Sequence, residues 1–214
     1  VEEAIARVPE WKGKEIKYEA ELTGITNPNY KVIVNDAPYF LKIPGAGTDA
    51  FIDRDNCHAA SLIAMKTNVG PVVTHFFEDT GVEIWEWLEG YRQVVWGDMY
   101  DENTVNIIAK GIRKFHDNKD HVLPVKQTLF EQSWHMIELA KAGGYEPPQH
   151  ETFMNLQKRI EEAIMKDGID YKPCHNDFWS NNFMFNDNKQ DFKMVDFEYA
   201  SMNDPYNDLG CFST

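Results

Sequence analysis

The first ninety residues alternate between short apolar runs and clusters of turn-forming residues. Runs rich in β-branched and aromatic residues predict strands. The five predicted strands cover residues 17–23, 30–34, 39–43, 72–77 and 82–88. Between the third and the fourth, residues 54–67 carry alanine, leucine, isoleucine and methionine at helical spacing, which predicts a helix. Because turn residues join the neighbouring strands as hairpins, we expect a small antiparallel sheet carrying one helix.

The rest of the chain has a helical pattern with one further hairpin. Apolar residues recur at helical spacing in three segments, each of which predicts a helix. The predicted helices cover residues 102–116, 129–142 and 152–166. Near the end of the chain, apolar runs at 183–185 and 192–195 flank a turn-rich segment and predict a hairpin. A sheet followed mainly by helices predicts an α+β fold.

Three polar residues flank the hairpin predicted at 183–195, namely Asp177 and Asn182 before it and Asp196 after it. Asp177 and Asn182 are separated by the spacing of the catalytic Asp and the metal-binding Asn in the kinase catalytic loop. The hairpin returns Asp196 towards them, so the three side chains should converge. Alone, Asp177 is more simply read as a turn or cap residue, but the combination supplies what phosphoryl transfer requires. We expect Asp177 to orient the attacking hydroxyl and Asn182 and Asp196 to hold Mg²⁺.

These motifs resemble those of the choline/ethanolamine kinase family. The resemblance rests on His-Asn-Asp and the following Asn at 175–182, Val-Asp-Phe-Glu-Tyr-Ala at 195–200, Asn-Asp-Pro at 203–205 and Asp-Leu at 208–209. The family belongs to a group with aminoglycoside phosphotransferases and protein kinases. The resemblance implies ATP and Mg²⁺ as cofactors and a small cationic amino alcohol as the acceptor of the γ-phosphoryl group. It also implies a protein-kinase-like fold whose two lobes cover residues 1–88 and 89–214, with a hinge at about 84–90.

The resemblance further implies where ATP binds. The turn after the first strand lies where a kinase covers the phosphates, Lys42 lies where a kinase lysine neutralises them, and the hinge lies where backbone groups take the adenine. The candidates are Thr23, Gly24, Thr26, Asn27, Lys42, Glu86, Trp87 and Leu88. Taken alone, the turn is an ordinary hairpin and the lysine a solvated strand residue, so these candidates depend on the family resemblance.

Five residues beside the catalytic motifs receive other roles. Glu198 is expected to help with the metal or to face the cationic substrate. Trp179 and Tyr199 could contribute aromatic faces to a quaternary ammonium, although core packing is the default for any aromatic side chain. His175 and Asp208 resemble residues that brace the catalytic loop, so their expected role is structural.

Two departures from the family pattern leave alternatives open. Cys57 stands where the following helix should supply a Glu partner for Lys42. Chains of the family also continue well beyond the Asp-Leu at 208–209, so the last helices, which build much of the amine pocket, are expected to be missing here. A non-catalytic nucleotide-binding pseudokinase would explain both departures, although the intact catalytic residues count against it. An aminoglycoside or other small-alcohol phosphotransferase would share the phosphate machinery.

Composition narrows the partners. The net charge of −14 argues against a nucleic-acid partner and suits a cationic substrate. No apolar run approaches the ~20 residues that span a bilayer, so we expect no membrane insertion. The 3 cysteines are odd in number and widely spaced, which indicates reduced thiols and a cytoplasmic protein.

Overall fold

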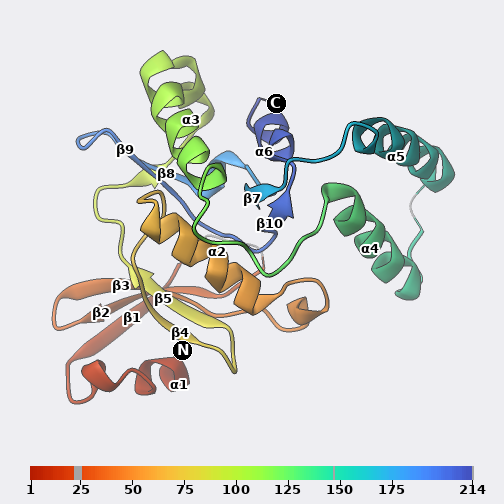
Figure 1. The fold of residues 1–214 in the computed structure, drawn as a ribbon. Coiled ribbons are helices and arrows are strands. Elements are labelled where there is room, and N and C mark those ends of the chain that lie inside the picture. Colours follow the sequence, from red (N-terminus) through yellow and green to blue (C-terminus); the bar gives the residue numbers. More distant parts are fainter. Residues whose placement is uncertain (22–25, 147, 214) are drawn as a thin grey trace.

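The computed structural model describes residues 1–21, 26–146 and 148–213. Figure 1 shows an amino-terminal sheet crossed by helix α2, followed by a mainly helical part. The sheet has the order β1-β2-β3-β5-β4, and all neighbouring strands are antiparallel. Its strands are β1 (Ile16–Glu21), β2 (Asn29–Val34), β3 (Ala37–Lys42), β4 (Val73–Phe77) and β5 (Val82–Glu86). The predicted five-stranded antiparallel sheet is confirmed.

The hairpin between β2 and β3 shows why the sheet forms where the sequence predicted it. Asn35 and Asp36 have φ angles of 46° and 69°. A two-residue hairpin turn requires this left-handed conformation, and Asn and Asp tolerate it better than most residues. The turn fixes the register of β2 against β3 and so places Lys42 opposite Asn29 at the end of the pair.

Helix α2 (Arg54–Lys66) joins the two parts of the molecule. Its first turn is capped by the side chain of Asp53, which accepts from the amide of Asn56 at 2.9 Å. Its buried residues Ala60, Ile63 and Ala64 pack in the same hydrophobic cluster as residues of the carboxy-terminal part. Movement of α2 would therefore disturb both parts.

An amino-terminal segment that the sequence analysis did not predict also packs against the sheet. Helix α1 (Glu2–Ala6) and the 3₁₀ helix η1 (Pro9–Trp11) pack Val8 and Trp11 against apolar residues of the sheet. Periodicity has little power over elements this short, because a single helical turn contains too few positions to show a repeat.

The carboxy-terminal part contains α3 (Glu102–His116), α4 (Leu129–Ala142), α5 (His150–Met165) and α6 (Pro205–Phe212). Its short helices are η3 (Trp96–Tyr100) and η4 (Ser180–Asn182), whereas the short helix η2 (Thr48–Ala50) precedes α2 in the amino-terminal part. Its strands are β6 (Arg92–Gln93), β7 (Lys172–Cys174), β8 (Phe183–Asn186), β9 (Asp191–Met194) and β10 (Ser201–Asn203). The predicted helices and the β8–β9 hairpin are confirmed, whereas β6, β7 and β10 were not predicted. None of the described helices is long and apolar enough to cross a membrane.

The hydrophobic cluster that contains the α2 residues also fixes the β8–β9 hairpin, which lies between the two catalytic motifs. Ile108, Ile112 and Phe115 of α3 pack with apolar residues of β8 and β9. Gly111 permits the close approach, since a Cβ atom there would lie 2.5 Å from Cδ1 of Phe192. Helix α3 therefore holds β9, and β9 leads directly to Asp196. The division into lobes at residue 88 stays a prediction.

Candidate active site

The loop after β7 brings Asp177 and Asn182 together. Asn176 has a φ angle of 66°, which turns the chain sharply at the start of the loop. The side-chain amide of Asn182 then donates to the carbonyl oxygen and to Oδ2 of Asp177, both at 3.0 Å. The first predicted pair is therefore in direct contact, and the Asp177 carboxylate is held by its neighbour.

Asp208 holds the start of this loop through hydrogen bonds to its backbone. Its carboxylate is completely buried and accepts from the backbone amides of His175 at 2.8 Å and Asn176 at 2.7 Å. Nε2 of His116 lies 2.8 Å from the same carboxylate. His175 in turn donates from Nε2 to the carbonyl oxygen of Val195 at 2.9 Å. These contacts agree with the structural roles proposed for His175 and Asp208.

Asp208→Asn should lower the free energy of unfolding by about 3 kcal/mol, because the amide replaces an accepting oxygen by a donor and leaves buried partners unpaired. The change is measured by chemical denaturation, with Asp120→Asn as a matched control on the exposed surface. Equal stability of the two variants would show that Asp208 does not hold the loop.

Asp196 of the carboxy-terminal lobe forms an ion pair with Lys42 of the amino-terminal lobe. Asp196 has a φ angle of 69°, and its Oδ1 lies 2.5 Å from Nζ of Lys42. Nζ also lies 3.4 Å from Oε1 of Glu198. Burial lowers the pKa of Lys42, but the charges of Asp196 and Glu198 outweigh it, so the pKa is raised overall. The sequence left open which group takes the place of a Glu partner on the following helix, and in the structure carboxylates of the carboxy-terminal part lie beside Lys42.

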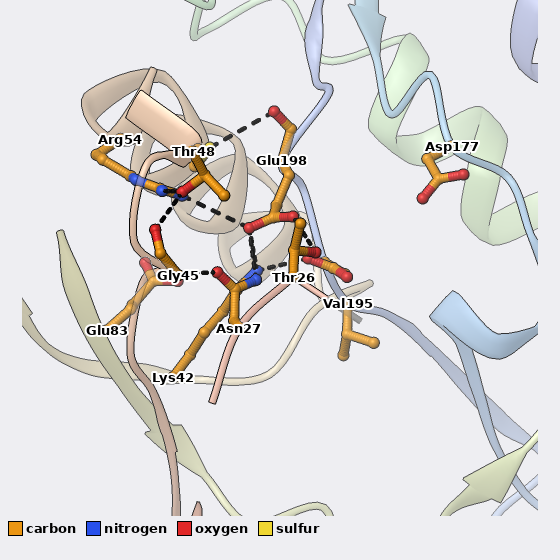
Figure 2. A network of polar contacts seen from close by, with 12 residues as sticks. Thr26, Asn27, Lys42, Gly45, Thr48, Arg54, Glu83, Asp177, Val195 and Glu198 are labelled. Carbon is orange, nitrogen blue, oxygen red and sulfur yellow. Dashed lines mark hydrogen bonds and ion pairs between the residues drawn. The ribbon is translucent and has the colours of Figure 1, made fainter. Parts of the chain in front are cut away.

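Glu198 lies at the centre of a polar network, shown in Figure 2. Its carboxylate accepts from the hydroxyl of Thr26 at 3.0 Å and from the side-chain amide of Asn27 at 2.5 Å. Nη1 of Arg54, at the start of α2, lies 3.5 Å from it. In Figure 2 these partners surround Glu198, whereas Asp177 lies apart from the network. Glu198 thus faces the amino-terminal lobe rather than the side where Asp177 would meet an acceptor.

The described end of the predicted phosphate loop is fixed by Gly45. The backbone amide of Gly45 donates to Oδ1 of Asn27 at 3.1 Å. A Cβ atom at Gly45 would lie 1.9 Å from the carbonyl oxygen of Thr26. Only glycine permits this approach, and no local pattern could have predicted it because the contact joins separate loops. Two other predicted loop residues, Thr23 and Gly24, lie outside the described residues.

Gly45→Ala should lower the free energy of unfolding by about 1–3 kcal/mol, since the backbone of Thr26 must move to admit the methyl group. Gly97→Ala is the matched control, because a Cβ atom at Gly97 meets nothing within 4 Å. Thermal and chemical denaturation of both variants measure the difference. Indistinguishable transitions would contradict the close packing of Gly45 against Thr26.

The hinge candidates Glu86, Trp87 and Leu88 are expected to contact adenine through backbone groups, some of which are already hydrogen-bonded within the protein. The amide of Glu86 donates to the carbonyl oxygen of Val72, and its carboxylate accepts from the amide of Val72, both at 2.9 Å. Glu86 therefore closes the end of the sheet with its amide, while the carbonyl oxygens of Trp87 and Leu88 accept from the amides of Glu89 and Tyr91. The adenine contact expected of these three residues stays a prediction. The Trp87 ring lies beneath Nζ of Lys31, 4.3 Å from its centroid.

The two aromatic candidates lie in different surroundings. Trp179 is 65% exposed and follows Asp177 closely in the loop. Tyr199 is half-buried, and its pKa is raised first by burial and then by the charges of Glu198, Asp177 and Asp196. Tyr199 therefore lies within electrostatic reach of the acidic residues, whereas Trp179 offers a free face beside the loop.

The oxygen donors fit a magnesium ion. The amide of Val195 donates to the carbonyl oxygen of Asn182 at 3.0 Å, which holds Asp196 beside the catalytic loop. The side-chain amide nitrogen of Asn182 is engaged by Asp177, so its Oδ1 points the other way. Amide and carboxylate oxygens are the ligands that Mg²⁺ prefers. Asn182 and Asp196 are thus suited to hold the ion between the loop and Lys42.

This chain is similar to known proteins in sequence and to solved structures in fold. Protein LicA of Haemophilus influenzae is 22% identical over 192 residues, which are 89% of this chain and 56% of that protein. The crystal structure of a choline/ethanolamine kinase family protein from Mesorhizobium loti is 25% identical with a TM-score of 0.79, and covers 98% of this chain and 68% of its own. A crystal structure of LicA in complex with AMP is 22% identical with a TM-score of 0.80, over 98% of this chain and 72% of that one.

These structures confirm the kinase-like fold predicted from the sequence. The chain spans little more than half the length of the curated LicA protein that it matches. The family model described as choline/ethanolamine kinase matches residues 19–214, which is most of the chain. This protein therefore belongs to the choline/ethanolamine kinase family.

Proposed function

We propose that this protein transfers the γ-phosphoryl group of ATP to the hydroxyl of choline or ethanolamine. The observation that carries the proposal is that the Asp177–Asn182 loop and the segment with Asp196 lie together beside Lys42. Asn182 contacts the Asp177 carboxylate, and Asp196 contacts Lys42 across the lobes. A base for the hydroxyl, oxygen ligands for a metal and a cation for the phosphates are the parts that phosphoryl transfer needs.

Lys42 and the metal ligands are proposed to act on the phosphates. Mg²⁺ held by Asn182 and Asp196 would neutralise charge on the phosphate oxygens when bound. Lys42 remains charged because its carboxylate neighbours raise its pKa, so it can pair with the α- and β-phosphates of ATP. The AMP bound to the structurally similar LicA supports a nucleotide in this fold. Thr26, Asn27, Trp87 and Leu88 are proposed to enclose it.

Asp177 is proposed to act on the acceptor. Its carboxylate is oriented by the side-chain amide of Asn182 and lies on the side of the site away from the Glu198 network. From that position Asp177 can accept a hydrogen bond from the acceptor hydroxyl and take its proton as the new bond forms. The net charge of −14 would attract a cationic alcohol. Trp179 and Tyr199 are proposed as aromatic contacts of its ammonium group.

The non-catalytic alternative loses its main argument. That argument was Cys57, which stands where a Glu partner of Lys42 is expected. Lys42 in fact lies 2.5 Å from Asp196 and 3.4 Å from Glu198, so its position is fixed without a carboxylate on α2. We therefore favour an active phosphotransferase.

The test is ADP release with choline, ethanolamine or kanamycin as acceptor, with and without magnesium. Magnesium-dependent release stimulated by choline or ethanolamine is the expected result. Stimulation by kanamycin alone would replace the proposed acceptor by an aminoglycoside. ATP binding without ADP release, whichever of the three acceptors is present, would contradict catalysis by this chain.

A further inference from the structure

Helix α2 presents no carboxylate to Lys42, although its first turn lies beside it. Cys57 of this turn lines a cavity of about 20 Å³ together with Lys42, Arg54 and Glu198. Burial raises the pKa of the Cys57 thiol to about 12, so the thiol is uncharged at neutral pH. The charged group that α2 contributes is instead the cation Arg54. The carboxylate that pairs with Lys42 and Arg54 therefore has to come from an element other than α2.

Glu198 supplies the negative charge between the two cations. Its side chain is only 3% exposed and lies 3.4 Å from Nζ of Lys42 and 3.5 Å from Nη1 of Arg54. The same carboxylate accepts from Thr26 and Asn27, and the Sγ atom of Cys57 donates to the Glu198 carbonyl oxygen at 3.8 Å. One residue of the carboxy-terminal lobe thus ties together the phosphate loop, strand β3 and helix α2.

Both carboxylate oxygens of Glu198 are already engaged. Oε1 lies within reach of Asn27, Lys42 and Arg54, and Oε2 accepts from Thr26. A metal ion or a cationic substrate could approach Oε1 only by displacing one of its three partners, and a buried carboxylate is costly to separate from its cations. In Figure 2 the carboxylate also points into the amino-terminal network and not towards Asp177.

We propose, resting on the kinase function proposed above, that Glu198 is a positioning residue that replaces the missing carboxylate of α2. It holds Lys42 and the Thr26–Asn27 end of the loop in the arrangement that ATP needs. Asp196 alone cannot hold this arrangement, because it is the proposed metal ligand and its side chain pairs with Lys42 alone among the described residues. Glu198 contacts the loop and α2 as well, so it fixes the two lobes relative to one another around the phosphates.

The first variant is Glu198→Gln, which keeps the shape and removes the charge. It should weaken the binding of Mg·ATP by about tenfold, measured by calorimetry, because two cations lose a shared partner. Turnover at saturating ATP and acceptor should fall much less, since Asp177, Asn182 and Asp196 are unchanged. Circular dichroism and thermal unfolding confirm that the variant is folded before binding is compared.

The decisive variant adds Cys57→Glu to Glu198→Gln. A carboxylate on α2 beside Lys42 should recover most of the lost ATP affinity, whereas Cys57→Gln in the same background should recover none. In the presence of native Glu198, Cys57→Glu should give no gain, because it places a second acid beside Glu198 and Glu83. Recovery by glutamate and not by glutamine is a result that a merely structural role of Glu198 would not produce.

Three results would overturn the proposal. Unchanged ATP affinity in Glu198→Gln would show that Glu198 positions nothing that ATP uses. Equal recovery by Cys57→Gln would show that charge on α2 is irrelevant. A need for more magnesium at saturating ATP, without recovery by Cys57→Glu, would make Glu198 a metal ligand.

If Glu198→Gln does not fold, Arg54→Gln gives a second test. It removes the second cation beside Oε1 of Glu198 and should also weaken ATP binding. Unchanged affinity would overturn the proposal. The measurements that decide the proposal use ATP binding, and acceptor turnover serves only as a control. They decide the role of Glu198 even if no acceptor is phosphorylated and the proposed function fails.

Discussion

Asp177→Asn is expected to reduce phosphoryl transfer by about 10²–10⁴-fold, the usual contribution of a positioned general base. The amide has nearly the same shape, and its oxygen can still accept from the side chain of Asn182, so the loop should keep its conformation. The amide cannot take a proton from the acceptor hydroxyl. ATP affinity should remain nearly unchanged, because Asp177 lies apart from the network around Lys42 and Glu198.

Single-turnover kinetics with saturating acceptor measure this loss directly, and calorimetry with Mg·ATP supplies the binding control. A loss of turnover with retained binding is the predicted combination. Parallel loss of both would indicate a disturbed fold, and nearly native turnover would mean that the proton leaves by another route.

Asp196→Asn is expected to reduce turnover by about 10²–10³-fold or more, because it removes charge where negative phosphate oxygens must be neutralised. The variant affects two groups at once. It weakens a proposed magnesium ligand, and it removes the carboxylate that lies 2.5 Å from Nζ of Lys42. The magnesium dependence of ATP binding should therefore be lost or shifted to much higher concentration.

The matched control is Asp191→Asn, at the other end of β9. Asp191 accepts from the hydroxyl of Tyr91 and is paired with Lys193, so it belongs to the same hairpin without belonging to the site. A magnesium titration of ATP binding in both variants separates the effects. If Asp196→Asn keeps the native magnesium dependence, Asp196 does not hold the metal.

Local patterns in the sequence predicted much of the fold. The helix at residues 102–116 begins and ends as predicted, because its apolar face and the Asp101 cap are both encoded within a few turns. The β8–β9 hairpin follows from its turn-rich centre. The proximity of Asp177 and Asn182 also follows from local sequence, since one short loop contains both.

The contacts of Glu198 could not be predicted in the same way. Thr26 and Glu198 are 172 positions apart, and no local pattern indicates that a loop of one lobe meets a carboxylate of the other. The approach of Gly45 to Thr26 is equally non-local. The family pattern singles out position 57, but only the three-dimensional arrangement places the Glu198 carboxylate beside both Lys42 and Arg54.

The measurement that tests the central claim most directly is mass spectrometry of the acceptor after incubation with magnesium and ATP carrying ¹⁸O in the γ-phosphoryl group. We predict a phosphate monoester of choline or ethanolamine that contains the label, and no such product with Asp177→Asn. Labelled inorganic phosphate with an unmodified acceptor, or no consumption of ATP, would contradict the assignment of this protein as an amino-alcohol kinase.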